Sequence, residues 1–294
     1  MINLFSLFEY LTEKNKFKLL LLNVHYNKYL NIDKIKNIER KYIYNKVFLR
    51  IKVCDLYYKI HNIDHLINIR KIETNNNAIT NILRKQNKLV YLLNNNLYCS
   101  INHMKSLKFL DLGYDFELKN FNKLTLLRKI HCRDQDLNLK YISKLRFLIT
   151  RGMCQTNIEK LTQLKILNCG SNEKVSELKN MPNLVNLDCT GIFCSLSAIN
   201  TLTNLKKLKC SGNINISNIN NLTNLTYLDC SFTTINQDNI QNLTKIKKIK
   251  LIRNYNINNL NHMTNLRYID ASFSKINKDS ILELKKIKTT KFSN

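Results

Sequence analysis

Residues 202–213 read Leu-Thr-Asn-Leu-Lys-Lys-Leu-Lys-Cys-Ser-Gly-Asn, and residues 222–233 read Leu-Thr-Asn-Leu-Thr-Tyr-Leu-Asp-Cys-Ser-Phe-Thr. Both stretches place aliphatic residues at an opening position and at +3 and +6 from it. This spacing returns every 18–21 residues from Leu66 to the C-terminus. Such a period indicates a solenoid, because a single coil cannot bury its apolar face and must stack on its neighbours. The opening residues are Leu66, Gln86 (the weakest match), Met104, Leu124, Ile142, Leu161, Met181, Leu202, Leu222, Leu243, Met263 and Leu284.

Each coil contains one short predicted strand. Residues 206–211 alternate between inward side chains, Leu208 and Cys210, and side chains that we expect in solvent, and a period of two is typical of a strand. Strands of successive coils are expected to pair in parallel, about 4.8 Å apart. The remainder of a coil is too short for a full helix, so we expect extended or 3-10 turns there.

The turn that follows each strand is predicted to be stabilised by an asparagine side chain. An Asn at +11 can satisfy the turn backbone with its side-chain amide, and such residues stack as a ladder. Ile214, Ile216 and Ile219 are then expected to form the apolar wall behind the strand. The +11 asparagines are Asn77, Asn172, Asn213 and Asn254.

The repeat resembles the leucine-rich repeat family, whose consensus is LxxLxLxxN, and the match covers about three quarters of the chain. The short period and the Leu-Thr-Asn-Leu opening look most like the internalin-like and phosphatase-regulator-like classes. The resemblance implies an α/β solenoid, with parallel strands on the concave side and little helix on the convex side. We expect about 11–12 coils over residues 61–294, and a non-enzymatic scaffold for protein–protein interaction.

Residues 1–60 are not part of this predicted repeat and are interpreted as helical. Leu4, Leu7, Phe8 and Leu11 follow the i, i+3, i+4, i+7 spacing of an amphipathic helix. A small helical cap here would cover the open edge of the first coil, which a solenoid requires.

The same segment resembles the later part of an F-box, in Leu7-Phe-Glu-Tyr-Leu11 and then Leu19, Leu22-Asn23, Tyr26 and Leu30. The usual Trp is Tyr26, and the family's leading LPxE segment would have to precede Leu7 by about eight residues, more than the chain has. The resemblance implies docking on a Skp-type adaptor of a ubiquitin ligase, with the repeats holding the substrate. A generic cap and an F-box-like module both remain open. The adaptor-binding residues would be Leu7, Phe8, Leu11, Leu19, Leu22 and Tyr26.

The chain is strongly basic, with 47 Lys and Arg against 21 Asp and Glu and a net charge of +26. One interpretation of this charge is a functional site for a polyanion. Such a site would use Lys-rich flanks such as Lys245, Lys247, Lys248 and Lys250. The other reading is compositional drift, because the excess is spread along the whole chain. Nucleic acid is the less favoured partner, because carboxylates on the predicted concave face would repel phosphates.

The cysteines are predicted to be buried thiols, because Cys132, Cys169, Cys189, Cys210 and Cys230 share the inward +8 position. Strand spacing exceeds the Cβ separation of about 3.8 Å that a disulfide prefers. No CxxC pair is present, and His61 and His65 lack further ligands, so we expect no metal and no cofactor.

The sequence carries no phosphate-binding glycine loop, GxSxG or HExxH motif, so no enzyme activity is predicted. The N-terminus lacks a signal peptide, and the longest aliphatic run, residues 19–22, cannot span a membrane. We therefore expect a monomeric intracellular protein of the cytoplasm, or of the host cytoplasm for a viral protein.

The predicted concave face has two outward columns, at +5 and +7. In the +7 column, Asp188, Lys209, Asp229, Lys250 and Asp270 alternate in sign, which favours a self-satisfied charge ladder. Alternatively the face docks a protein, with Tyr227 and Tyr268 as anchors. The candidate partner-binding residues are Tyr91, Phe109, Phe147, Lys207, Tyr227, Asp229, Lys248, Tyr268 and Asp270.

Overall fold

The computed structural model divides the chain into two compact units, residues 1–130 and 131–294. The structure describes residues 30–31, 50–53, 71–74, 83–84, 87–97, 100–116, 123–133, 137–151, 155–156, 158–170, 178, 181–191, 199–216, 218–277 and 279–293. Strand β6 (Lys129–Arg133) contains the boundary between the units.

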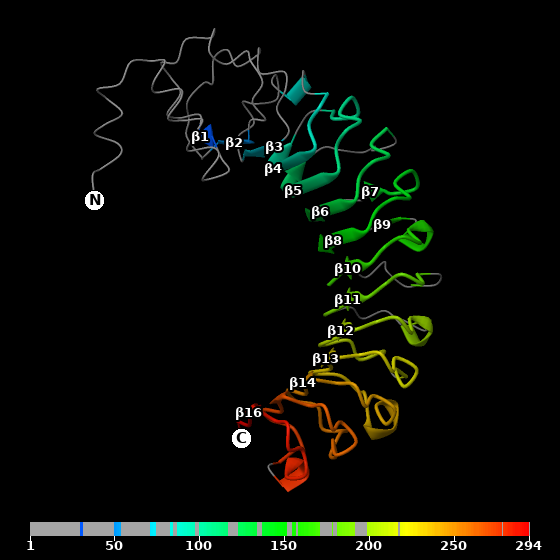
Figure 1. Ribbon diagram of the computed structural model, residues 1–294, viewed down its shortest axis with the longest axis vertical. Coiled ribbons are helices and arrows are strands. Elements are labelled where there is room, and N and C mark those ends of the chain that lie inside the picture. Colours follow the sequence, from blue (N-terminus) through cyan, green and yellow to red (C-terminus); the bar gives the residue numbers. More distant parts are fainter. Residues whose placement is uncertain are drawn as a thin grey trace, which may run out of the picture. The chain divides into compact units, whose positions relative to one another are not determined.

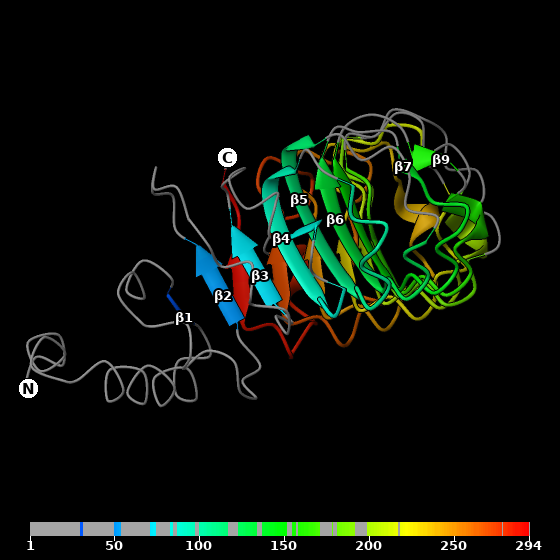
Figure 2. The same cartoon turned by 90° about the horizontal axis from the view of Figure 1, so that it is seen from above.

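The first unit is built on a parallel ladder with one strand per coil. Leu30, Ile51, Ile72, Leu92 and Leu110 are successive partners along it. Figure 2 shows β2, β3, β4 and β5 side by side and running in one direction. The strands are β1 (Leu30–Asn31), β2 (Arg50–Val53), β3 (Lys71–Thr74), β4 (Tyr91–Leu97) and β5 (Phe109–Phe116).

Two of these strands lie in the segment that the sequence predicts to be a helical cap. At β1 and β2 the structure has strand in place of helix, and the register continues the repeat upstream, since Ile51 pairs with Ile72. The rest of the predicted cap and the boundary near residue 60 lie outside the described residues. So do the adaptor-binding candidates Leu7, Phe8, Leu11, Leu19, Leu22 and Tyr26, together with His61 and His65.

The second unit continues with the same construction. Eight strands pair in parallel in the order β8-β10-β11-β12-β13-β14-β15-β16, and a small separate pair joins β7 to β9. The predicted register of the +5 and +7 positions is confirmed, because Lys207, Tyr227, Lys248 and Tyr268 are direct partners, as are Lys209, Asp229, Lys250 and Asp270. The strands are β7 (Leu137–Asn138), β8 (Phe147–Arg151), β9 (Gln155–Thr156), β10 (Ile166–Asn168), β11 (Asn186–Asp188), β12 (Lys207–Lys209), β13 (Tyr227–Asp229), β14 (Lys248–Lys250), β15 (Tyr268–Asp270) and β16 (Thr289–Lys291).

The back of each coil carries little helix, as predicted. Figure 1 shows the strands of the second unit on the inner side of the coils and the turns on the outer side. Short 3-10 helices occur among these turns, namely η4 (Ile158–Lys160), η5 (Ile199–Thr201), η6 (Gln237–Asn239) and η7 (Asp279–Ile281).

The core is filled by the residues at the opening, +3, +6 and +8 positions. In the coil that opens at Leu222, the side chains of Leu222, Leu225, Leu228 and Cys230 are fully buried. Stacking the coils therefore removes these apolar side chains from water. Each Å² of apolar surface that is buried stabilises the fold by about 25 cal/mol.

The predicted apolar wall is confirmed at Ile216 and Ile219 but wrong at Ile214, which is 54% exposed. Asn213 takes the inward position instead, and its Oδ1 accepts a hydrogen bond from the Asn215 N–H at 3.1 Å. This turn sends Ile214 to the surface and brings Ile216 back to the core.

The turn role of the +11 asparagines is confirmed at Asn213 and Asn254, the two that are described. They do not form the expected ladder, because the buried Nδ2 of Asn213 has no hydrogen-bond partner among the described residues and Thr233 takes the +11 position between them. Asn254 is fully buried, and its Nδ2 donates to the carbonyls of Cys230 and Ile235 in the preceding coil. Its Oδ1 accepts from the Asn256 N–H at 3.0 Å, so one amide joins two coils. Asn77 and Asn172 lie outside the described residues.

An asparagine ladder that was not predicted forms at +2. Asn183, Asn204 and Asn224 each donate from Nδ2 to the +1 carbonyl of the preceding coil, at 2.9, 2.7 and 3.1 Å. The recurring Leu-Thr-Asn-Leu opening was its sequence signal.

The thiols also form a ladder, which comprises Cys169, Cys189, Cys210 and Cys230. All four are buried and free, as predicted. Each Sγ lies within 3.2–3.6 Å of the +7 carbonyl of the next coil, as in the Cys210 contact with the Asp229 carbonyl. The backbone N–H of each Cys donates to the same oxygen, at 2.8 to 3.0 Å.

This environment suppresses thiolate formation. Burial raises the pKa of the Cys210 thiol well above its usual range, and Cys189 and Cys230 raise it further. Burial likewise raises the pKa of Cys230, with a contribution from Asp229. A thiol that stays protonated is a poor nucleophile and a poor metal ligand, so the ladder is structural.

We predict that Leu208→Ala lowers the free energy of unfolding by about 2–5 kcal/mol, because it leaves a cavity between stacked coils. Lys209→Ala, one residue along the same strand, removes an exposed ion pair and should cost at most about 1 kcal/mol. Urea unfolding followed by circular dichroism measures both, and equal losses would contradict the assigned core.

We predict that the four ladder thiols resist a thiol reagent in the native protein and react once it is denatured. At Cys210 and Cys230 the resistance should persist at pH 9, because burial raises the pKa of both thiols well above the ordinary thiol range. Rapid labelling of Cys169, Cys189, Cys210 and Cys230 without denaturant, followed by peptide mapping, would disprove burial.

Candidate functional site

The outward +5 column of the second unit alternates lysine with tyrosine over β12 to β15. Lys207 Nζ lies 5.6 Å from the centre of the Tyr227 ring, and Lys248 Nζ lies 5.7 Å from it. Lys248 Nζ also lies 4.1 Å from the Tyr268 ring centre. We call Lys207, Tyr227, Lys248 and Tyr268 the Lys–Tyr column. Cation–π contacts of about 0.5–1 kcal/mol each hold these side chains in order.

Tyr227 is the centre of this column. Its ring is flanked by a lysine from the strand before and one from the strand after. Burial raises the pKa of the Tyr227 hydroxyl to about 12, and the carboxylates of Asp229 and Asp188 add to the shift. The hydroxyl therefore stays neutral and available as a hydrogen-bond donor over the physiological range.

The outward +7 column does not form the predicted charge ladder. Of its alternating residues 188, 209, 229, 250 and 270, only Lys209 and Asp188 form an ion pair, with Nζ and Oδ2 3.0 Å apart. Lys209 is about half exposed, so solvent screens the pair and its contribution is small.

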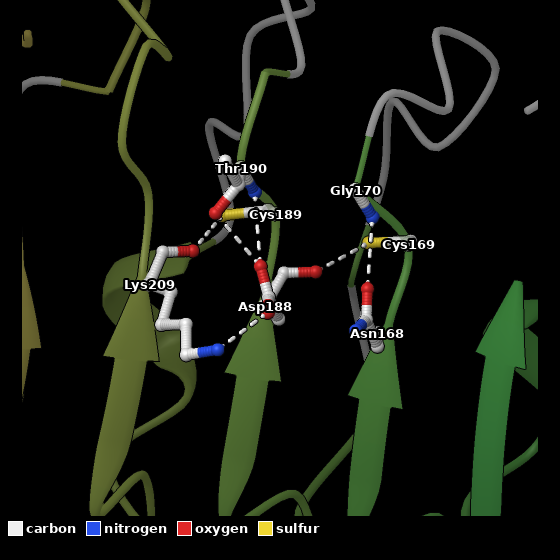
Figure 3. A network of polar contacts seen from close by, with 7 residues as sticks. All are labelled: Asn168, Cys169, Gly170, Asp188, Cys189, Thr190 and Lys209. Atoms are coloured by element: carbon white, nitrogen blue, oxygen red, sulfur yellow. Dashed lines mark hydrogen bonds and ion pairs between the residues drawn. The ribbon is translucent and has the colours of Figure 1, made fainter. Parts of the chain in front are cut away.

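The carboxylates in this column close the turn at the end of their own strand. Asp188 Oδ1 accepts from the Thr190 N–H at 3.3 Å and from the Thr190 hydroxyl at 2.8 Å. Asn168 Oδ1 accepts in the same way from the Gly170 N–H at 3.2 Å (Figure 3). Asp229 Oδ1 accepts from the Ser231 N–H at 3.3 Å. An Asx side chain bonded two residues on stabilises a turn, which explains why Asp and Asn recur at +7.

Asp270 is the exception to the outward prediction, because it is only 7% exposed. Its Oδ1 accepts from the Ser272 hydroxyl at 3.1 Å, and its Oδ2 lies 3.5 Å from the Tyr268 hydroxyl. These contacts tie the last tyrosine of the Lys–Tyr column to the turn after its strand, so Asp270 supports the face without presenting a free carboxylate.

The remaining predicted partner-binding residues lie on other strands. In the first unit, Tyr91 and Phe109 are neighbours on β4 and β5, with ring centres 6.2 Å apart. In the second unit, Phe147 lies on β8 and pairs in register with Ile166. These side chains are partly exposed, and they follow the same +5 column within their own unit.

A group of residues at +10 was not predicted from the sequence. Phe232, Arg253 and Phe273 follow three successive strands, and the Arg253 guanidinium lies 5.8 Å and 5.5 Å from the two phenyl ring centres. All three are exposed, and all have positive φ, between 52° and 55°. Two earlier coils place Gly191 and Gly212 at this position. A non-glycine residue in this left-handed conformation destabilises the fold by roughly 1–2 kcal/mol. The residue type at +10 follows no repeating pattern, so the sequence did not reveal the group.

The Lys-rich flank proposed for a polyanion is partly occupied by the protein itself. Lys245 Nζ donates to Asn224 Oδ1 at 2.8 Å, and Lys248 lies over two tyrosine rings. Lys247 and Lys250 have no such contacts within the described part of the chain.

Among the residues that the structure describes, no three His, Cys, Asp or Glu side chains are placed to hold a metal ion. Nor does any described helix have the length and apolar character needed to cross a membrane.

Comparison with known proteins rests on the fold, since no protein-family model and no curated protein matches the sequence. An internalin (inlF) from Listeria monocytogenes matches with a TM-score of 0.61 and 20% identity, over 87% of this chain and 77% of its own. A leucine-rich repeat protein from Leptospira interrogans matches with a TM-score of 0.61 and 21% identity, over 79% of this chain and 74% of its own. The functional domain of InlJ from L. monocytogenes includes a cysteine ladder. It matches with a TM-score of 0.52 and 18% identity, over 83% of this chain and 56% of its own.

Two further matches are complexes. One is the plant peptide hormone receptor RGFR1 with RGF2, with a TM-score of 0.54 and 20% identity over 71% of this chain and 40% of its own. The other is TLR13 with a single-stranded RNA, with a TM-score of 0.56 and 14% identity over 88% of this chain and 52% of its own. At such identities the likeness shows the fold alone. The fold of this protein is a solenoid of parallel strands with little helix, as in leucine-rich repeat proteins.

Proposed function

We propose that the protein is a non-enzymatic, monomeric interaction scaffold that binds a protein partner on the outward sheet face of β12 to β15. The Lys–Tyr column is the observation that carries this proposal. Tyrosine is enriched among binding hot spots, because it offers a large contact area and a hydroxyl at low conformational cost. Here the lysines on either side already fix the Tyr227 ring, so a partner would spend little entropy in ordering it.

The chemistry of the column supports a protein partner. The Tyr227 hydroxyl stays neutral, and the lysine ammonium groups beside it supply charged donors. The peptide-bound receptor among the structural matches supports the same class of ligand. A binding role also agrees with the thiol ladder, whose protonated thiols are unsuited to chemistry.

A finer version of the proposal concerns the N-terminal segment. In it, residues 7–30 dock on a Skp-type adaptor through the F-box-like residues Leu7, Phe8, Leu11, Leu19, Leu22 and Tyr26. The repeat face then recruits the substrate of a ubiquitin ligase, and the protein acts in the cytoplasm. The support is the sequence resemblance, together with a folded repeat array that offers a surface for a substrate.

We predict that Tyr227→Ala with Tyr268→Ala abolishes capture of a cellular partner by the immobilised protein, because the hot-spot anchors are lost. Tyr141 and Tyr255 are exposed tyrosines outside the +5 and +7 columns, so Tyr141→Ala with Tyr255→Ala is the matched control and should retain the partner. Quantitative mass spectrometry compares the three captures. Retention of every specific partner by the first pair would refute binding on this face.

We predict that deleting residues 1–29, which stops before β1, abolishes co-purification with a Skp-type adaptor and leaves the repeats folded. Adaptor binding is read by immunoblot and folding by circular dichroism. If the full chain brings down no adaptor and the deletion variant aggregates, the segment is a cap over the solenoid edge and the adaptor role is wrong.

A further inference from the structure

A third outward column lies at +4, one residue before the strands of the second unit. Over its eight parallel strands the residue at this position is basic in six, whereas the +5 column has lysine in two. The +2 position of the same coils is also mostly exposed and is basic in only three of the eight, so an excess of lysine spread evenly over exposed positions does not explain the +4 column. The two interruptions are Val185 and Thr226. We call the six residues the edge column: Arg146, Lys165, Lys206, Lys247, Arg267 and Lys288.

The backbone holds the edge column in line. The Lys247 N–H donates to the Thr226 carbonyl, the Arg267 N–H to the Lys247 carbonyl and the Lys288 N–H to the Arg267 carbonyl, each at 2.8 Å. Residues at this position therefore succeed one another at the strand spacing of about 4.8 Å. Seven such intervals give the column a length of about 34 Å.

The charged ends of this column are unused by the protein. All six side chains are exposed, and none has an ion pair, hydrogen bond or ring contact within the described part of the chain. Some other lysines of the unit do have partners, since Lys209 pairs with Asp188 and Lys286 donates to Asn265. Like charges on adjacent strands repel, so the run Lys247, Arg267, Lys288 destabilises the fold. No contact within the described part of the chain offsets this repulsion.

The carboxylates of this face lie at +7, three residues and about 10 Å along the strand from the edge column, where solvent and salt weaken their attraction for its cations. Asp188 is bonded to Lys209 and Thr190, Asp229 to the Ser231 N–H, and Asp270 to Ser272 and Tyr268. The face therefore carries unbalanced positive charge along one edge, and an acidic partner complements it.

We propose that the edge column binds an extended acidic segment of the protein partner, running across the strands. This inference rests on the proposed function and specifies the chemistry of its ligand. At about 3.3 Å per residue, roughly ten extended residues span the column.

The Lys–Tyr column disfavours single-stranded nucleic acid as the occupant. Binding of single strands relies on aromatic rings on which the bases stack. Here Lys207 and Lys248 lie over the Tyr227 ring, and Lys248 lies over that of Tyr268. The interruptions at Val185 and Thr226 also fit a peptide with mixed side chains better than a chain with a phosphate at every unit.

The test measures binding of a fluorescein-labelled peptide of alternating Glu and Ser, about ten residues long, by fluorescence anisotropy. We expect the wild-type full chain to bind it, and Lys247→Glu with Arg267→Glu to weaken binding about tenfold, because two adjacent attractions become repulsions. Lys160→Glu with Lys275→Glu alters two exposed lysines outside the column and gives the same net charge. This control should weaken binding less than about threefold, since charges beyond the Debye length are screened.

Equal losses in the two variants, or no binding by the wild type, would overturn the acidic-segment site. Tighter binding of oligothymidylate of the same length, with the same dependence on Lys247 and Arg267, would overturn it in favour of nucleic acid. The outcome is separable from the proposed function. If the edge variant binds the acidic peptide like the wild type while Tyr227→Ala with Tyr268→Ala still loses the captured partner, only this inference fails.

Discussion

The parallel register between coils is the constraint on which the rest of the structure depends. Each strand has only three described residues over much of the second unit, yet its backbone hydrogen bonds place equivalent residues of successive coils side by side. A slip of one residue would turn Leu208 outward and Lys209 into the core, so burial of the +6 leucines fixes the pairing. Once it is fixed, any residue type that recurs at one position becomes a ladder. The +2 asparagine ladder, the thiol ladder and the Lys–Tyr column are all consequences of this one alignment.

The same alignment separates charges that a globular domain would intersperse. Carboxylates at +7 are positioned to accept hydrogen bonds from their own turns, as Asp188 does from Thr190. Cations at +4 point into solvent from the opposite end of the strand and find no such partners among the described residues. Identical positions repeat along the array, so this local separation adds up to a continuous basic edge. A net charge of +26 alone would not show it.

The sequence was sufficient for the fold and for the columns, because the leucine period determines both. It was insufficient wherever a turn decides the direction of a side chain. Ile214 was expected inside, but the bond from the Asn215 N–H to Asn213 reverses the alternation there. The charge ladder failed for a similar reason, since pairing depends on whether a lysine reaches across one strand, and Lys209 does while Lys250 does not. Strands β1 and β2 were missed because the repeat was recognised by its opening leucine. Counting back from Ile51 and Leu30 at +6, those openings are Asn45 and Val24.

The opposite end of the strands has a different character, and the contrast limits how a partner can lie on the face. Phe232 and Phe273 flank Arg253 at a turn position where Gly191 and Gly212 show that no side chain is needed. Three successive coils thus accept a strained backbone conformation at exposed positions, where packing does not require it, and such outliers motivate a hypothesis of function. The face is therefore bordered by cations without a partner in the described part of the chain before the strands, and by the Phe232–Arg253–Phe273 group after them. A partner lying across β13 to β15 would meet cations alone along one edge and two phenyl rings around Arg253 along the other, so only one of its two orientations would match both edges.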